Sequence, residues 1–156
     1  MLGLSPSPFA GDPNATTIGK HSGGNAVTID NAATLKAFLP AGGPSGSLTV
    51  SGDAHYDSPS DIPDPTGGGT GSKGSGGGTL SGQAMAMGLS LFLSGKTVVS
   101  VTYPAGLGDV MISSSGNLLC TGRGSVCEAF SFPVCAQGKK VSEIRDAANN
   151  FLVLLR

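Results

Sequence analysis

Charged residues are scarce in this sequence. Lysine, arginine, aspartate and glutamate together make up 12% of the chain, about half the usual share. The formal net charge is −1 and the charges are scattered along the chain. No basic face is therefore expected, which argues against nucleic acid or an anionic membrane surface as a partner.

Long apolar runs are also missing, since a membrane crossing needs about 20 predominantly apolar residues. The longest candidate, residues 79–95 (TLSGQAMAMGLSLFLSG), carries no charge but contains serine and glutamine. It has no flanking cluster of lysine or arginine, so we expect no membrane span. Its two adjacent apolar stripes predict a buried core helix that other elements enclose. Thr79 is the expected N-cap, Gly95 the stop, and Lys96 follows at the negative end of the helix dipole.

The usual patterns of catalysis are missing as well. The chain has two histidines, His21 and His55, and no G-x-S-x-G sequence. Residues 69–74 (GTGSKG) match G-x-G-x-x-G, but Pro63 and Pro65 stand where a dinucleotide fold needs a strand. We read this tract as a linker and expect the protein not to be an enzyme.

One arrangement suits a metal ion. Asp53, His55 and Asp57 alternate, so on a strand they would share one face. Carboxylates and imidazole are common metal ligands, and the acids of residues 53–64 also suit calcium. The alternative is a solvated loop, and a hydrolase around His55 is the least favoured functional interpretation. We expect no cofactor.

The three cysteines lie within sixteen residues, at spacings that match no usual zinc site. They predict one disulfide, between Cys120 and either Cys127 or Cys135, and one remaining thiol. Three reduced cysteines are the alternative.

Glycine is abundant, with 26 residues, more than double the average share of about 7%. Its distribution divides the chain into four expected segments. These are an extended N-terminal arm (1–24), a small strand and helix segment (25–65), a Gly-rich linker (66–78) and a helix-centred core domain (79–156). Because Pro6, Pro8 and Pro13 lie in the arm, we expect no helix there. The first residues show no signal peptide, so any export signal would lie upstream or have been removed.

The remaining segments predict an α+β fold. In this fold a buried central apolar helix is enclosed by short β-strands and a C-terminal helix, with long Gly/Pro-rich loops. Strands are expected near residues 26–29, at 47–51 and at 97–103. A short helix after Asp30 or Asn31 should end at Pro40, and residues 52–78 read as a surface loop. Residues 107–112 read as strand or irregular core.

The C-terminal residues 139–156 show helical periodicity, with Glu143, Arg145, Asp146 and Asn149 on the polar side. The chain ends on apolar residues that complete its own core or contact a neighbouring subunit. The candidate assembly residues are Phe151, Leu152, Leu154 and Leu155.

The order of four stretches, TLKAFLPAGG, GGGTLSGQAMAMGLSLFLSG, LGDVMI and VSEIRDAANNFL, resembles a known module. It is a recurrent C-terminal module of large secreted cell-surface proteins of Bacteroidota-type bacteria. The likeness covers roughly residues 76–150, with a fainter echo at residues 31–43. It departs from the pattern at Ser90, where asparagine is expected, and in the cysteine-rich insert. It implies display, adhesion or assembly, and it carries over no catalytic residue.

These observations favour a non-catalytic extracellular or cell-surface structural or adhesion module, which self-associates as a fibre subunit or joins a larger assembly. The alternative is a glycan- or peptide-binding module that uses the loop 52–78. Exposed aromatic residues would support this alternative, and Tyr56 is the one that the loop offers.

Overall fold

The computed structural model describes residues 8–11, 13–20, 24–39, 43–63, 77–98, 100–112 and 134–154. Both helices and short strands occur in these ranges, which confirms the α+β class. The first half contains α1 (Pro8–Gly11), η1 (Pro13–Thr16), β1 (Thr17–Gly19), β2 (Ala26–Ile29), α2 (Ala32–Phe38), β3 (Asp53–Tyr56) and η2 (Pro59–Asp61). The second half contains α3 (Gly78–Leu93), β4 (Thr97–Val98), β5 (Val101–Thr102), η3 (Leu107–Asp109), η4 (Val134–Ala136) and α4 (Val141–Leu154).

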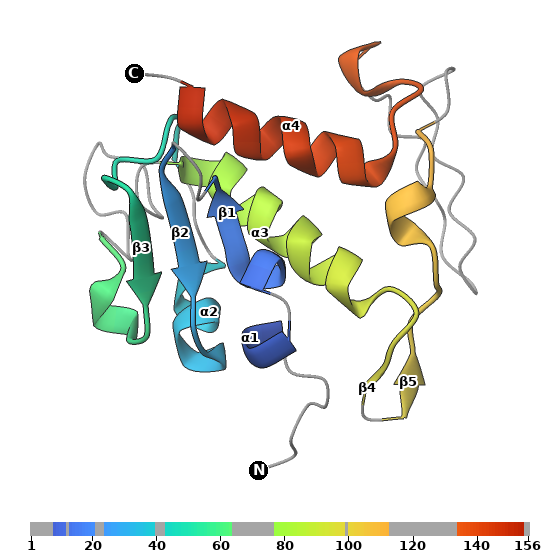
Figure 1. The fold of residues 1–156 in the computed structure, drawn as a ribbon, viewed down its shortest axis with the longest axis horizontal. Helices are drawn as coiled ribbons and strands as arrows, with labels where there is room; N and C mark the ends of the chain where they lie inside the picture. The colour runs from blue at the N-terminus through green and yellow to red at the C-terminus, as the bar shows by residue number, and fades with distance from the viewer. Residues whose placement is uncertain are drawn as a thin grey trace.

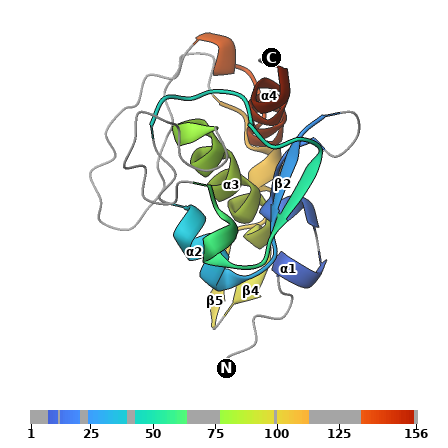
Figure 2. The same ribbon diagram turned by 90° about the vertical axis from the view of Figure 1, so that its left-hand side faces the viewer.

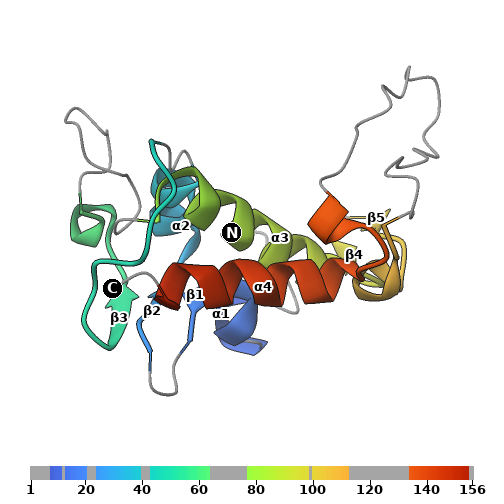
Figure 3. The ribbon, with the colours of Figure 1, turned by 90° about the horizontal axis from the view of Figure 1, so that it is seen from above.

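Two long helices connect two small sheets (Figure 1). Seen from above, α4 runs along α3, with β3 at one end of the molecule and the β4–β5 hairpin at the other (Figure 3). The side view places α2 and α3 on the same side of β2 (Figure 2). The helices therefore form the body of the molecule and hold its two sheets apart.

The larger sheet has the order β1-β2-β3, with β1 antiparallel and β3 parallel to the central strand. A parallel pair needs a crossover connection, and α2 lies in this one. Of the two predicted caps, Asp30 and Asn31, it is Asn31 that caps α2, by accepting a hydrogen bond from the backbone N–H of Thr34 at 2.9 Å.

The position of the third strand differs from the prediction. The strand is residues 53–56, expected to be loop, whereas residues 47–51 form no strand. The β2–β3 ladder is extended at its ends, where Ala26 donates to Gly52 O and Asp30 to Tyr56 O, each at 3.0 Å. Strand propensity is weak compared with the pairing that a neighbouring backbone offers, so the sequence pattern was misleading here.

The central helix α3 matches the predicted segment closely, but it is enclosed on one face only. Ser81, Met85 and Phe92 are buried at helical spacing, while Gln83 and Ser90 on the opposite side are exposed. The polar residues of the segment are thus divided between the two faces. Because Ser81 is buried, its hydroxyl donates to the carbonyl of Gly78 at 2.7 Å.

The two ends of α3 depend on glycine in different ways. The helix starts at Gly78, whose φ of +57° and close approach to Pro44 O leave no room for a side chain. Thr79 is therefore not the N-cap, and its hydroxyl instead donates to Gly43 O at 3.0 Å. At the other end Gly95 has a φ of +75°, which confirms it as the stop.

The N-terminal segment contains helical turns, whereas an extended arm without helix was expected. Pro8 and Pro13 each start a short helical turn, where a missing N–H is tolerated. The next residues form β1, and Ala15 and Ile18 are buried. Residues 15–18 therefore belong to the core, and the expected exclusion of helix by proline is wrong for residues 8–11 and 13–16.

A single hydrophobic cluster unites the segments that the sequence separates at the linker. It joins residues from β1, β2, α2, β3, α3 and α4 and from the segments that flank β3 and η2: Ile18, Val27, Ile29, Phe38, Leu48, Tyr56, Ile62, Ala84, Met85 and Leu152. The predicted segments 25–65 and 79–156 thus contribute to one core.

The expected strand 97–103 folds back on itself. β4 and β5 form an antiparallel hairpin in which Ser100 has a positive φ of 66°. The ladder continues beyond the strands, since Tyr103 donates to Lys96 O at 2.9 Å and Gly95 to Pro104 O at 3.1 Å.

The C-terminal helix α4 is confirmed, but its predicted polar side is not entirely exposed to solvent. Asn149 is buried, and its Oδ1 accepts a hydrogen bond from Gly19 N at 3.2 Å. Arg145 Nη2 donates to Thr17 O at 3.3 Å. These groups belong to β1, an edge strand, so α4 side chains occupy the hydrogen-bonding positions that a fourth strand would otherwise take.

Replacing Asn149 with alanine is expected to lower the free energy of unfolding by about 1–3 kcal/mol, because the amide N–H of Gly19 loses its partner. Chemical denaturation measures this change. Asp146→Ala, on the exposed side of the same helix, is the control and should change stability by no more than about 0.5 kcal/mol. Equal effects of the two substitutions would contradict the edge-strand role of Asn149.

Candidate functional site

The structure places the predicted metal ligands on and after β3, where they are exposed. His55 Nδ1 lies 3.2 Å from Asp30 Oδ2, which brings in an acid that the spacing did not indicate. In the described part of the chain, no group of three His, Cys, Asp or Glu residues is arranged to hold a metal ion. Asp53 and Asp57 thus do not converge with His55 on a metal centre.

The neighbourhood of Asp57 is organised by backbone contacts. Asp61 accepts hydrogen bonds from the N–H groups of Asp57 at 3.2 Å and Ser58 at 2.8 Å. Asn31 donates to the carbonyl oxygen of Asp57. The acids of this loop therefore serve a capped turn and the connection to α2.

The cysteine prediction is only partly accessible to the structure. Cys135 is exposed in η4 and forms no disulfide with a described residue. Cys120 and Cys127 lie outside the described residues, so the pairing stays a prediction.

The C-terminal assembly residues divide into two kinds. Leu152 is fully buried in the chain's own core, and its carbonyl accepts a hydrogen bond from Leu48 N at 2.8 Å. It is therefore not available to another subunit. Phe151 is 43% exposed, whereas Leu155 and the side chain of Leu154 lie outside the described residues.

A further exposed apolar surface follows the β4–β5 hairpin. Its side chains are Val101, Tyr103, Val110 and Met111, with exposed fractions of 55%, 38%, 43% and 60%. We call these four residues the apolar strip. Sequence patterning suggested strand or core here, and no signal in the sequence distinguishes these positions from buried ones.

The apolar strip borders a pocket of about 290 Å³ at the C-terminal end of α3. The pocket lies between Leu93 on the helix and Tyr103, Leu107 and Val110 on the segment that follows β5. Ser94 fixes this segment, since its hydroxyl donates to Pro104 O at 3.1 Å and accepts from Leu107 N at 3.0 Å. These two hydrogen bonds thus attach the segment between Tyr103 and Val110 of the apolar strip to the end of α3.

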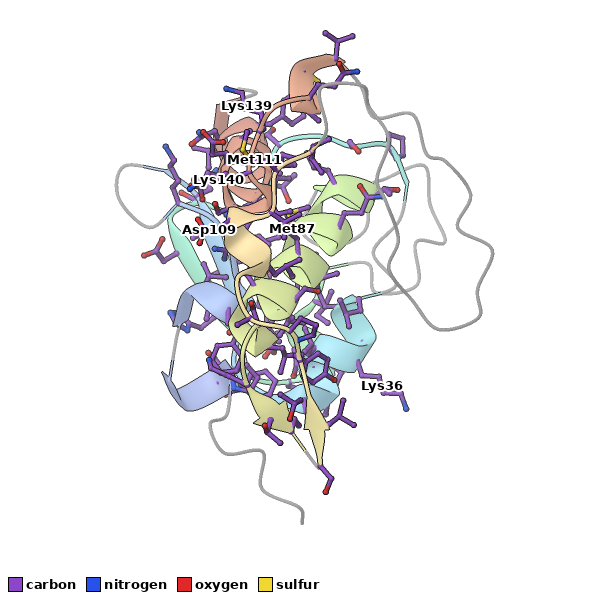
Figure 4. All side chains as sticks on the ribbon, turned by 90° about the vertical axis from the view of Figure 1, so that its right-hand side faces the viewer. Lys36, Met87, Asp109, Met111, Lys139 and Lys140 are labelled. Carbon is purple, nitrogen blue, oxygen red and sulfur yellow. The ribbon has the colours of Figure 1, made fainter. Side chains whose placement is uncertain are left out.

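One end of the apolar strip is attached to the start of α4. Met111 forms an isolated bridge with Lys140, and Lys140 Nζ lies 2.9 Å from Asp109 Oδ1. Figure 4 shows Asp109, Met111 and Lys140 gathered on this side of the molecule. The hydrogen bond and the charge of Lys140 lower the pKa of Asp109 below its ordinary value of 3.8. The same contacts raise the pKa of Lys140 above 10.5.

Comparison with protein-family models, curated proteins and solved structures finds no match for this chain. The resemblance to a bacterial surface-protein module therefore stays a prediction. Among the described helices, none combines the length and hydropathy that a membrane crossing needs.

The Asp109–Lys140 ion pair should persist from the lowered pKa of Asp109 up to the raised pKa of Lys140. As the pH falls through the lowered pKa of Asp109, the carboxylate is protonated and its contribution is lost. As the pH rises through the raised pKa of Lys140, the ammonium is neutralised and the contribution is lost again. An NMR titration of the Asp109 carboxyl carbon should show the lowered pKa.

Lys140→Gln should return the pKa of Asp109 toward 3.8, while Lys139→Gln, a neighbouring charge change, should leave it lowered. High salt should weaken the effect, because both side chains are largely exposed. A pKa for Asp109 that is the same in the native chain and in Lys140→Gln would show that the pair does not form in solution.

Proposed function

We propose that this chain is a non-catalytic structural or adhesion module of the extracellular surface, and that it self-associates through the apolar strip. The observation that carries the proposal is the exposure of four apolar side chains within eleven residues, which begin in the β4–β5 hairpin and continue to the bridge between Met111 and Lys140. Grouped exposed apolar side chains are typical of protein–protein contact surfaces, whereas single ones are common everywhere.

The hairpin also offers backbone hydrogen bonds to a partner. A two-stranded sheet has two edges, and one edge can pair with the opposite edge of the hairpin of a second copy, a head-to-tail contact that can continue from copy to copy. Tyr103 and Val101 would then supply apolar contacts beside the new ladder. Hydrogen-bonded edge pairing with apolar flanks is suited to a subunit that repeats itself in a fibre.

The scarcity of charge supports the same function. Elements α1, α2 and α3 together contain a single charged residue, Lys36. Weak net charge lowers the repulsion between copies of a chain, so that apolar contact is enough to hold them together. The extracellular setting rests on composition and on the resemblance to a surface module.

Sedimentation velocity over a range of concentrations tests the proposal. We expect the native chain to self-associate, and the double variant Val101→Lys and Met111→Lys to weaken association by roughly tenfold or more. The reason is that each substitution places a charge where an apolar side chain loses its water on contact.

The matched control is Leu39→Lys with Val134→Lys, which changes two exposed apolar residues outside the apolar strip and should leave association unaltered. Phe151→Lys separates the strip from the predicted C-terminal contact. A native chain that stays monomeric at high concentration would contradict self-association. Dissociation by Phe151→Lys alone would move the contact surface to α4.

A further inference from the structure

A second pocket lies between the N-terminal turn and the helices. It has a volume of about 230 Å³. Side chains from four elements line it: Phe9 of α1, Leu35 of α2, Leu89 and Phe92 of α3, and Val98 of β4. The remaining lining residues, Pro8, Ala32 and Leu93, are also apolar.

Such a lining favours an apolar guest over water. Water in this pocket would find few of the two to four hydrogen-bonding partners that it needs, because the lining is apolar. A water-sized group takes up about 30 Å³, so this pocket has room for about seven carbon groups. The guest is therefore a short alkyl chain or a group of similar size.

A cation lies over the ring of one residue that lines this pocket. Lys96 Nζ is 3.1 Å from the centroid of the Phe92 ring, a cation–π contact that keeps the ammonium beside a lining residue. Elements α1, α2 and α3 carry no acidic side chain. The acid that precedes α2, Asp30, lies 3.2 Å from His55. The charge beside the pocket is thus positive.

We propose that this pocket binds the alkyl chain of a small anionic amphiphile, a straight-chain carboxylate of about eight carbons, with Lys96 contacting the carboxylate. The chain would lie against Leu35, Leu89 and Phe92. The proposal does not depend on self-association, because the apolar strip and this pocket share none of their residues.

The first test is a titration of the ¹⁵N-labelled full chain with hexanoate, heptanoate, octanoate and decanoate, followed by amide chemical shifts. We expect the shifts to centre on Leu35, Leu89 and Val98. Each added methylene should tighten binding by about fourfold, the factor that corresponds to burying one methylene group. The gain should stop where the pocket is full, near eight carbons.

Variants separate the two parts of the proposed ligand. Lys96→Met should reduce the affinity for octanoate by about two- to fivefold, the range of an exposed ion pair, and should leave the affinity for octan-1-ol unchanged. Lys96→Arg should keep the preference for octanoate. Lys36→Met is the matched control, since it removes a lysine that extends away from the body of the molecule (Figure 4) and should change neither affinity. Ala32→Phe places a ring at the pocket and should abolish binding of both.

Circular dichroism of each variant checks that loss of binding is not loss of folding. Shifts without chain-length dependence, or shifts centred on the apolar strip, would overturn the pocket assignment. Equal affinity for octanoate, octan-1-ol and octyltrimethylammonium would overturn the role of Lys96.

Residues 1–7 contain Leu2 and Leu4 and directly precede the pocket-lining Pro8. If octanoate binds only after Leu2→Ser and Leu4→Ser, the occupant is the chain's own N-terminal segment and the proposal fails.

Discussion

The packing of the buried face of α3 against β1 and α4 is the contact on which the rest of the structure depends. The face includes Gly88, where a side chain would lie 3.0 Å from Ala15 O and 3.2 Å from the guanidinium of Arg145. This close approach brings α4 near enough for Arg145 and Asn149 to bond the outer edge of β1. A larger residue at this position would push the layers apart, and the edge of the sheet would lose its partners.

Both candidate binding surfaces arise where α3 ends. The turn at Gly95 reverses the chain into the β4–β5 hairpin, which carries the start of the apolar strip to the end of the molecule. The same turn places Lys96 over Phe92. Leu93 lines both pockets, the one that borders the apolar strip and the one that contains Phe92. The position at which a single helix stops therefore determines where apolar surface and positive charge are presented.

Local patterning predicted the elements whose backbone pairs within a short stretch of chain. Helices α2, α3 and α4 lie where periodicity and the cap at Asn31 place them, because helical hydrogen bonds need no distant partner. The strands were less predictable. Residues 53–56 look like loop, yet they pair with β2, and residues 47–51 look like strand but lack a partner strand. Proline in residues 8–19 was also misleading, since Pro8 and Pro13 occupy first turns.

The sequence by itself determined the α+β class and the uncharged central helix with its glycine stop, and it indicated that none of the helices that the structure describes is suited to cross a membrane. The tertiary structure decided which face of each helix is inside. Asn149 and Arg145 belong to the polar side of α4 by periodicity, but an edge strand opposite them makes burial favourable. It also decided that Val101 and Met111 are exposed while Leu152 is buried. Burial is favourable for any apolar side chain, but the positions of the neighbouring elements decide which apolar residues are buried within the chain.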